Sequence, residues 1–145
     1  MKNDNSRRLV IIDTNCLLQM LGRYNRYHCL WEAFLQERFI WCISNDIVNE
    51  YEEILTLKAS AKVAYLFMQT LMRSPNIAKN DPYFHFGLIE QDKDDNKFVD
   101  CAIVAGADYI VSEDSHFRTL KSIPFPKVNV LLLDEFMKDI FPEEK

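Results

Sequence analysis

The sequence has little glycine and proline, and it has no stretch that resembles a linker. Its 145 residues include only 3 glycines and 5 prolines, with no Gly/Ser-rich segment, internal repeat or low-complexity region. Domain boundaries usually fall in such segments, so this chain offers few places for one. Apolar residues make up 48% of the chain and charged residues 27%, which favours a packed core over disorder. We therefore expect one domain over residues 1–145.

Cysteine motifs and membrane signals are also missing. The four cysteines form no C-x-x-C pair, and none stands near a histidine at zinc-finger spacing. Their neighbours are apolar, which is typical of small core residues in a reduced protein. The chain does not open on an apolar signal region, and no apolar run is long enough to cross a bilayer. These absences predict a cytoplasmic protein that does not act in a membrane.

Positive charge is the third shortage. Lysine and arginine together number 17 against 22 acidic residues, which gives a formal net charge of -5 and a pI of about 5.2. Affinity for phosphate comes from lysine and arginine, so the balance argues against a general nucleic-acid binder. It does not exclude a metal-dependent enzyme acting on nucleic acid, because the carboxylates that hold a metal are neutralised only when the metal binds.

Short apolar runs alternate with segments of helical spacing. We expect buried strands at residues 7–12, 39–44, 108–112 and 128–133, and a further strand at 83–89 within the loop of residues 76–91. We expect helices at residues 16–21, 27–38, 47–58, 61–74, 95–107, 116–123 and 134–141. Strands that alternate with helices predict an α/β fold with a mainly parallel sheet and helices on both faces.

Four carboxylates stand at strand ends or helix starts. Asp13 directly follows the first strand, and Asp114 comes three residues after Val111. Glu50 lies one to two turns into the helix after the second strand, and Asp95 opens the helix at 95–107. In a parallel sheet helices begin at the edge where strands finish, so these side chains can converge there. Clustered carboxylates take up a cation, and Mg²⁺ or Mn²⁺ held by oxygen ligands supports phosphodiester hydrolysis.

Each carboxylate also has an ordinary structural interpretation. Asp13 and Asp95 could cap helices, Glu50 could be a solvated helix charge, and Asp114 could belong to a surface turn. Their shared placement is what favours a functional site. Asp100 ranks below them, because five helical residues place it about 140° around the helix from Asp95. Asp100 reaches the same edge only if Asp95 lies at the cap, outside the regular turn.

The segments "VIIDTN", "IVNEYEEIL" and "DDNKFVDCAIVAGADYIVSED", followed by "SHF", together resemble the PIN-domain ribonucleases. The greatest similarity is to the bacterial PIN toxins of toxin–antitoxin pairs, and it extends over about residues 9–139. The resemblance implies a Rossmann-like three-layer α/β/α sandwich with a central mainly parallel sheet and an acidic pocket at the carboxyl ends of the strands. It also implies an endoribonuclease that depends on Mg²⁺ or Mn²⁺.

The resemblance assigns roles residue by residue. The four acidic residues of the family match Asp13, Glu50, Asp95 and Asp114. Asp13, Asp95 and Asp114 would hold the metal, and Glu50 would assist through water. Ser112 replaces the usual threonine but keeps its hydroxyl group, and Asn15 matches a small polar position that can orient the first aspartate. Many relatives also carry an acidic residue at the position of Asp100.

The partners implied by the resemblance are an RNA substrate, a cognate antitoxin and a second copy of the chain. Arg23 and Arg26 alternate with tyrosines, a pattern that suits phosphate pairing and base stacking, and Arg118 follows Asp114. An exposed turn and a solvated helix face are the competing interpretations for these arginines. The apolar residues of the segment 62–72 could form a dimer or antitoxin surface, or simply core packing. His116 is expected to be structural or exposed.

Three other functions remain open. A haloacid-dehalogenase-type phosphatase also has an aspartate after its first strand, but it needs a second aspartate where this chain has Asn15. A phosphoacceptor receiver domain needs an acidic pair on its first strand, which "VIIDTN" lacks. A catalytically degenerate PIN fold that only binds a partner would not need all four carboxylates.

Overall fold

A computed structural model describes residues 7–89 and 93–142 of the chain, and its centre is one parallel sheet. The strands are β1 (Leu9–Ile12), β2 (Ile40–Ile43), β3 (Ile77–Lys79), β4 (Tyr109–Val111) and β5 (Val130–Leu131). They lie in the order β3-β2-β1-β4-β5, and each neighbouring pair is parallel. The chain moves outward from β1 to β3 and then returns to the other side of β1. This reversal places a topological switch point between β1 and β4, where ligands of open α/β sheets usually bind.

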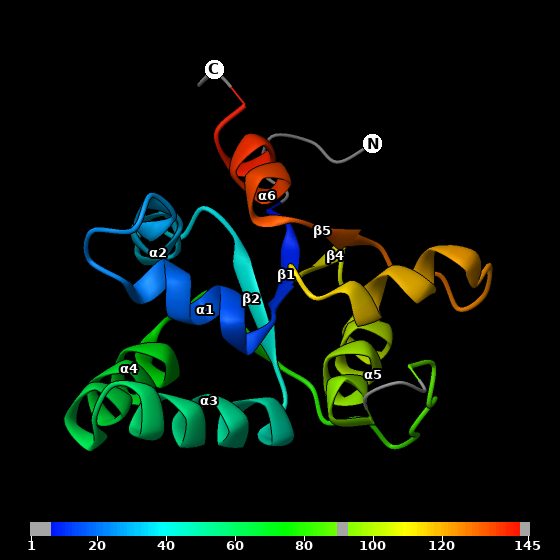
Figure 1. Ribbon diagram of the computed structural model, residues 1–145, viewed down its shortest axis with the longest axis horizontal. Coiled ribbons are helices and arrows are strands. Elements are labelled where there is room, and N and C mark those ends of the chain that lie inside the picture. Colours follow the sequence, from blue (N-terminus) through cyan, green and yellow to red (C-terminus); the bar gives the residue numbers. More distant parts are fainter. Residues whose placement is uncertain (1–6, 90–92, 143–145) are drawn as a thin grey trace.

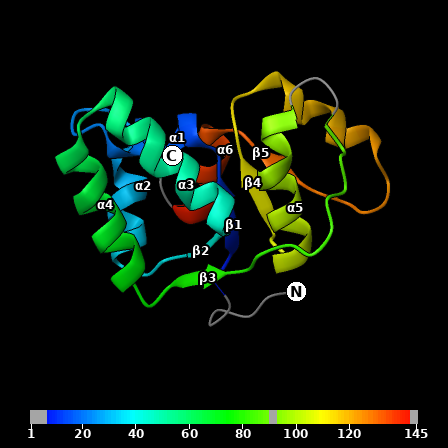
Figure 2. The ribbon, with the colours of Figure 1, turned by 90° about the horizontal axis from the view of Figure 1, so that it is seen from below.

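Helices cover both faces of the sheet, as expected (Figures 1 and 2). Figure 2 shows α1, α2 and α4 on one side of the sheet and α5 on the other. The elements are α1 (Thr14–Leu21), α2 (His28–Leu35), α3 (Asn45–Lys58), α4 (Ala61–Arg73), α5 (Asn96–Ala105), α6 (Leu133–Ile140) and the 3₁₀ helices η1 (Lys93–Asp95) and η2 (Ser115–Ser122). The predicted three-layer α/β/α architecture is confirmed.

Local sequence signals fix several helix ends. The Ser44 hydroxyl accepts a hydrogen bond from the Ile47 N–H at 3.3 Å and begins α3. The Ser60 hydroxyl accepts one from the Val63 N–H at 3.1 Å and begins α4. Gly106 ends α5 with a φ of 64°, a left-handed conformation that favours glycine. Ser44 thereby places the start of α3 at the edge where β2 finishes, and the turn at Gly106 returns the chain from α5 to β4.

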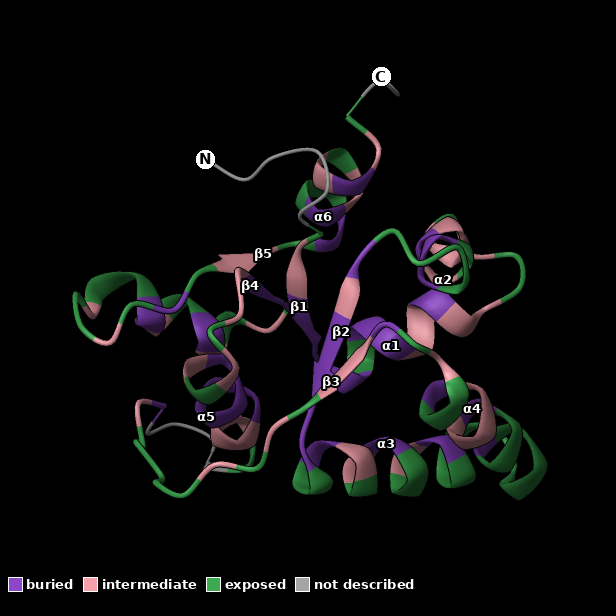
Figure 3. Cartoon of the chain, turned by 180° about the vertical axis from the view of Figure 1, so that it is seen from behind, coloured by how far each residue is buried: buried purple, intermediate pink, exposed green. Residues whose placement is uncertain are grey.

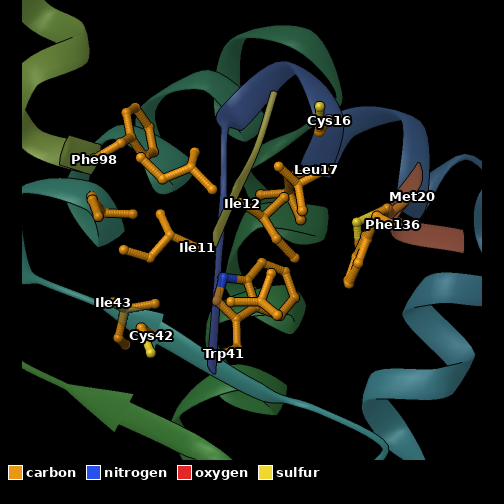
Figure 4. Packing of buried hydrophobic residues seen from close by; sticks show 14 of the residues in the cluster. Ile11, Ile12, Cys16, Leu17, Met20, Trp41, Cys42, Ile43, Phe98 and Phe136 are labelled. Carbon is orange, nitrogen blue, oxygen red and sulfur yellow. The ribbon is translucent and has the colours of Figure 1, made fainter. Parts of the chain in front are cut away.

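The core lies on both faces of β1 and β2, and both strands are largely buried (Figure 3). In Figure 4, Ile11 and Ile12 of β1 point to opposite sides, toward Phe98 of α5 and Leu17 of α1 respectively. On the Ile12 side, the Trp41 ring packs against aromatic rings of α2 and α4, with its centroid 5.0 Å from Phe34 and 6.0 Å from Phe67. A strand that is buried on both faces has an unbroken run of apolar residues in its sequence, and β1 (LVII) has this pattern.

The expected strand at residues 83–89 is wrong. These residues form no strand, and the edge strand beside β2 is β3 (Ile77–Lys79), which lies in the segment expected to be a loop. Asn76, just before β3, explains the difference. Its buried side-chain amide donates hydrogen bonds to the Phe34 and Phe39 carbonyl oxygens, each at 2.9 Å. This tertiary anchor outweighs the strand propensity of the aromatic run that follows.

Two other elements differ in form from the expectation. Residues 115–122 form the 3₁₀ helix η2, where an α-helix was expected at 116–123, and β5 contains only two of the residues expected at 128–133. The other helix ends shift by a few residues, which is ordinary for assignments at helix ends. Among residues 7–89 and 93–142, no helix combines the length and the apolar character needed to span a membrane.

Candidate metal centre

Asp13 lies at the end of β1 and is only 5% exposed. It occupies the N-cap position of α1, but its side chain makes no capping hydrogen bond. Instead, its Oδ2 accepts a hydrogen bond of 2.9 Å from the hydroxyl of Ser112, which follows β4. The same hydroxyl accepts a hydrogen bond of 3.0 Å from the Asp114 N–H. Ser112 therefore links the first and fourth strand ends at the switch point of the sheet.

Burial dominates the electrostatics of Asp13 and raises the pKa of its carboxyl group to about 6. The Ser112 hydroxyl and the Thr14 backbone N–H act in the opposite direction, because they stabilise the ionised form. The negative charges of Glu50 and Asp114 raise the pKa further. A buried carboxylate with acidic neighbours is costly without a compensating cation.

Asp95, Asp114 and His116 form a compact group of possible metal ligands. One ligand atom from each lies within 4.8 Å of the others. The His116 Nδ1 is 3.4 Å from Asp95 Oδ2 and 3.4 Å from Asp114 Oδ1. Asp95 stands at the N-cap of α5 without capping it, whereas Asp114 caps η2 by accepting a 2.9 Å hydrogen bond from the His116 N–H. The start of α5 and the start of η2 thus face each other across this group.

Glu50 reaches the same region from α3. Its Oε2 accepts a short hydrogen bond from the Thr14 hydroxyl, and its Oε1 pairs with the Lys97 ammonium group at 2.6 Å. Thr14 directly follows Asp13, and Lys97 lies in the first turn of α5. Thr14 of α1 and Lys97 of α5 therefore each hold one oxygen of Glu50. These contacts join α3, which carries Glu50, to the first turns of α1 and α5.

Asp100 lies in a different setting. It is buried on α5, and its carboxylate accepts a hydrogen bond of 3.0 Å from the Phe86 N–H and pairs with the His85 Nδ1 at 3.2 Å. It fastens the loop before α5 and does not belong to the group formed by Asp95, Asp114 and His116. Asn15, expected to orient Asp13, is exposed in the first turn of α1.

The three arginines considered for RNA binding are all exposed. Arg26 forms an ion pair with Asp134 at 3.1 Å and lies over the Tyr27 ring, so it fastens the loop between α1 and α2 to α6. Arg23 lies over the Tyr24 ring. Arg118 lines a hollow of about 310 Å³ together with Asp114, Ser112, Lys121, Val130, Leu132 and Glu135. Of the three, Arg118 is placed beside a residue of the candidate centre.

Sequence reasoning missed three contributors to this site. His116 was expected to be structural or exposed, but its ring nitrogen lies between two of the candidate ligands. Thr14 and Lys97, which hold Glu50, were given no role at the site. The available signal was proximity in sequence, because each lies one or two residues from a candidate aspartate.

The donor set suits a divalent cation. Carboxylate oxygens of Asp95, at the start of α5, and of Asp114, after β4, approach one another within 4.8 Å, and imidazole nitrogen is a common additional ligand. Asp13 is not a member of this group and adjoins it through the Ser112 hydroxyl. Asp95 and Asp114 are the residues best placed to hold such an ion directly, with Asp13 beside them through Ser112.

Two solved structures contain chains with a fold similar to that of this protein. A chain in the structure of VapBC2 from Rickettsia felis, bound to a DNA fragment from their promoter, is similar, with a TM-score of 0.60 and 12% identity over 86% of this chain and 98% of that one. A chain in DNA-bound VapBC from Salmonella typhimurium is similar with a TM-score of 0.57 and 14% identity over 88% and 99% of the two chains. At such identities the likeness shows the fold.

The sequence itself identifies the family. No curated protein matches this chain. The family model described as PIN domain matches residues 9–116, which contain β1 through β4 and all the candidate ligands. The chain therefore belongs to the PIN domain family.

Proposed function

We propose that this chain is a metal-dependent endoribonuclease that hydrolyses RNA phosphodiester bonds. The observation that carries the proposal is the grouping of Asp95 and Asp114 beside the buried Asp13 at the switch point of a PIN-family sheet. Asp13, Asp95 and Asp114 would hold Mg²⁺ or Mn²⁺, and Glu50 would act from the adjoining position. When bound, such an ion supplies Lewis acidity toward a phosphate oxygen and lowers the pKa of water.

The protein's own groups support that role by holding the carboxylates in place. Ser112 orients Asp13, and the turn that begins η2 orients Asp114. The Thr14 hydroxyl holds one oxygen of Glu50 by a hydrogen bond. Ligands fixed by neighbouring hydrogen bonds lose little freedom when a cation binds, which favours binding at a defined geometry.

RNA contacts are proposed at Arg118 and Arg23. Arg118 lies in the hollow beside Asp114 and can pair with a phosphate close to the metal. Arg23 stands on an exposed loop with Tyr24, whose ring can stack on a base. Arg26 is a weaker candidate because Asp134 already neutralises it.

We further propose that the chain is the toxin of a toxin–antitoxin pair and that it forms a homodimer. The likeness in fold to chains of two VapBC structures supports the first proposal. The second is supported by Val63, Leu66 and Met72, which are apolar and exposed on α4. Inhibition of the nuclease by the product of a neighbouring reading frame would test the pairing, and light scattering of a Leu66→Asp variant would test the dimer.

The nuclease proposal is tested by incubating the purified full chain with a mixed single-stranded RNA pool and Mn²⁺. We expect cleavage that EDTA abolishes and that falls by at least about a hundredfold in Asp95→Asn and Asp114→Asn. Asp46→Asn is a matched control, because Asp46 is an exposed carboxylate at the start of α3 outside the candidate centre. Cleavage that survives in both site variants would reject the site. No cleavage by the parent, or release of phosphate from a simple phosphate ester, would favour the rival functions.

A further inference from the structure

His116 is the unusual member of the candidate centre, because the expected ligands are all carboxylates. Its Nδ1 lies 3.4 Å from one oxygen of Asp95 and 3.4 Å from one oxygen of Asp114, and this nitrogen has almost no exposure to solvent. The ring as a whole remains about one third exposed. Nδ1 therefore faces the space between the carboxylates, as a ligand atom does.

The position of His116 is fixed by packing. The next residue, Phe117, is fully buried, and its ring centroid lies 6.4 Å from that of Phe98 on α5. Asp95 stands at the N-cap of the same helix, three residues before Phe98. The carbonyl oxygen of His116 also accepts a hydrogen bond of 3.0 Å from the Thr119 hydroxyl. The aromatic contact between η2 and α5 therefore also sets His116 opposite Asp95.

The two separations that involve the His116 Nδ1 are those expected for neighbouring ligands of a small divalent ion. Ligands at about 2.1 Å from a tetrahedral ion lie about 3.4 Å apart, and adjacent ligands of an octahedral ion of the same bond length lie about 3.0 Å apart. The two separations of 3.4 Å are close to both values. The third separation, between the carboxylate oxygens of Asp95 and Asp114, is also within 4.8 Å.

We propose that His116 is a metal ligand through Nδ1 and that it makes this centre prefer first-row transition ions over Mg²⁺. Mg²⁺ favours oxygen donors and retains its waters, whereas imidazole nitrogen suits the later transition ions. A centre with two carboxylates and one imidazole therefore binds Co²⁺ or Zn²⁺ more tightly than a centre of carboxylates alone. This inference rests on the proposed metal centre and adds the selectivity of that centre.

The test is a set of metal titrations of the full chain, with Co²⁺, Mn²⁺ and Mg²⁺ as probes. His116→Phe keeps a ring but removes the nitrogen, and His116→Asn can place an oxygen where Nδ1 stood. His85→Gln is a matched control, because His85 also pairs with a buried carboxylate but lies outside the centre. Thermal unfolding of each variant confirms that it is folded.

We expect His116→Phe to weaken Co²⁺ binding by at least about tenfold while Mg²⁺ affinity changes by less than about threefold. His116→Asn should bind both ions but lose the preference for Co²⁺, and His85→Gln should match the parent. Pulsed electron paramagnetic resonance of the Mn²⁺-loaded parent should show coupling to an imidazole nitrogen that His116→Phe lacks. Equal losses for Co²⁺ and Mg²⁺, unchanged affinities, or no nitrogen coupling would overturn the proposal.

These readouts separate the inference from the proposed nuclease activity. Nitrogen-ligated metal binding in a chain that cleaves no RNA would reject the nuclease and leave the ligand assignment standing. Metal-dependent RNA cleavage without nitrogen coupling, and with selectivity unchanged in His116→Phe, would reject the ligand assignment alone.

Discussion

The hydroxyl of Ser112 donates a hydrogen bond to the Asp13 carboxylate at 2.9 Å and so joins the ends of two neighbouring strands. Both side chains are buried, and the same hydroxyl accepts the Asp114 N–H. One small side chain thereby places two candidate ligands that stand a hundred residues apart in the sequence.

Ser112→Ala should disturb both contacts at once. We expect a loss of about 1–3 kcal/mol in the free energy of unfolding, because a buried donor and acceptor lose their partner. We also expect about a tenfold loss of Mn²⁺ affinity, as is usual when a group that orients a ligand is removed. Urea unfolding and calorimetric titration measure these effects. Ser112→Thr keeps the hydroxyl and should retain the Mn²⁺ affinity, so an equal loss in the two variants would contradict this role.

Asp13 should make stability depend on pH in a direction opposite to that of most carboxylates. Its pKa is raised from 3.8 to about 6 in the folded protein, so the folded state holds the proton more tightly than the unfolded state. Ionisation of Asp13 therefore costs stability as pH rises from about 4 to above 6. A shift of about 2 pH units limits this cost to about 3 kcal/mol.

Asp13→Asn removes that cost. In metal-free buffer the variant should match the parent near pH 3.5 and exceed its unfolding free energy by up to about 3 kcal/mol at pH 8. Chemical denaturation across this pH range provides the measurement. The prediction would be contradicted if the variant were less stable than the parent at pH 8. It would also be contradicted if the variant's gain in unfolding free energy did not vary with pH, because ionisation of Asp13 would then not cost stability.

Lys97 should compete with a bound cation, because its ammonium group lies 2.6 Å from Glu50 at the edge of the candidate centre. Lys97→Met removes one positive charge, and we expect Mn²⁺ to bind roughly threefold more tightly. Lys97→Arg keeps the charge and should change the affinity little. Titration at low ionic strength gives the clearest comparison, and weaker Mn²⁺ binding in Lys97→Met than in Lys97→Arg would contradict the competition.

Asp100 should stabilise a loop without contributing to metal binding. Asp100→Ala removes the acceptor for the Phe86 N–H and the partner of His85, so amide exchange over residues 81–89 should become faster. Mn²⁺ affinity should stay within about twofold of the parent, since no ligand is lost. If the affinity instead falls as far as in Asp95→Asn, then Asp100 is a ligand as well.

Much of this arrangement could be predicted from local pattern. The apolar runs before Asp13 and Asp114 predicted β1 and β4, and their placement at strand ends predicted that the two carboxylates would lie on one edge. The helical phase of Asp100 relative to Asp95 also ranked Asp100 below the other candidate ligands, and the two side chains occupy different environments. Each of these inferences depends on neighbours in the sequence.

The features that were missed depend on tertiary packing. His116 meets Asp95 because Phe117 packs on Phe98, a contact between segments about twenty residues apart that no periodicity encodes. The position of β3 depends on the hydrogen bonds of Asn76 to carbonyl groups near α2, which the apolar pattern does not reveal. Such contacts determine the positions of His116 and β3, but they produce no periodic pattern of apolar residues in the sequence.

A crystal of the full chain soaked in Mn²⁺ tests the central claim most directly, through the anomalous scattering of the ion. We predict a peak within coordination distance of Asp95 and Asp114, on the side of the sheet edge that carries Asp13 and His116. A peak bound by Asp46, Asp94 or Asp100 instead, or no peak at millimolar Mn²⁺, would contradict a metal centre at the junction of β1 and β4.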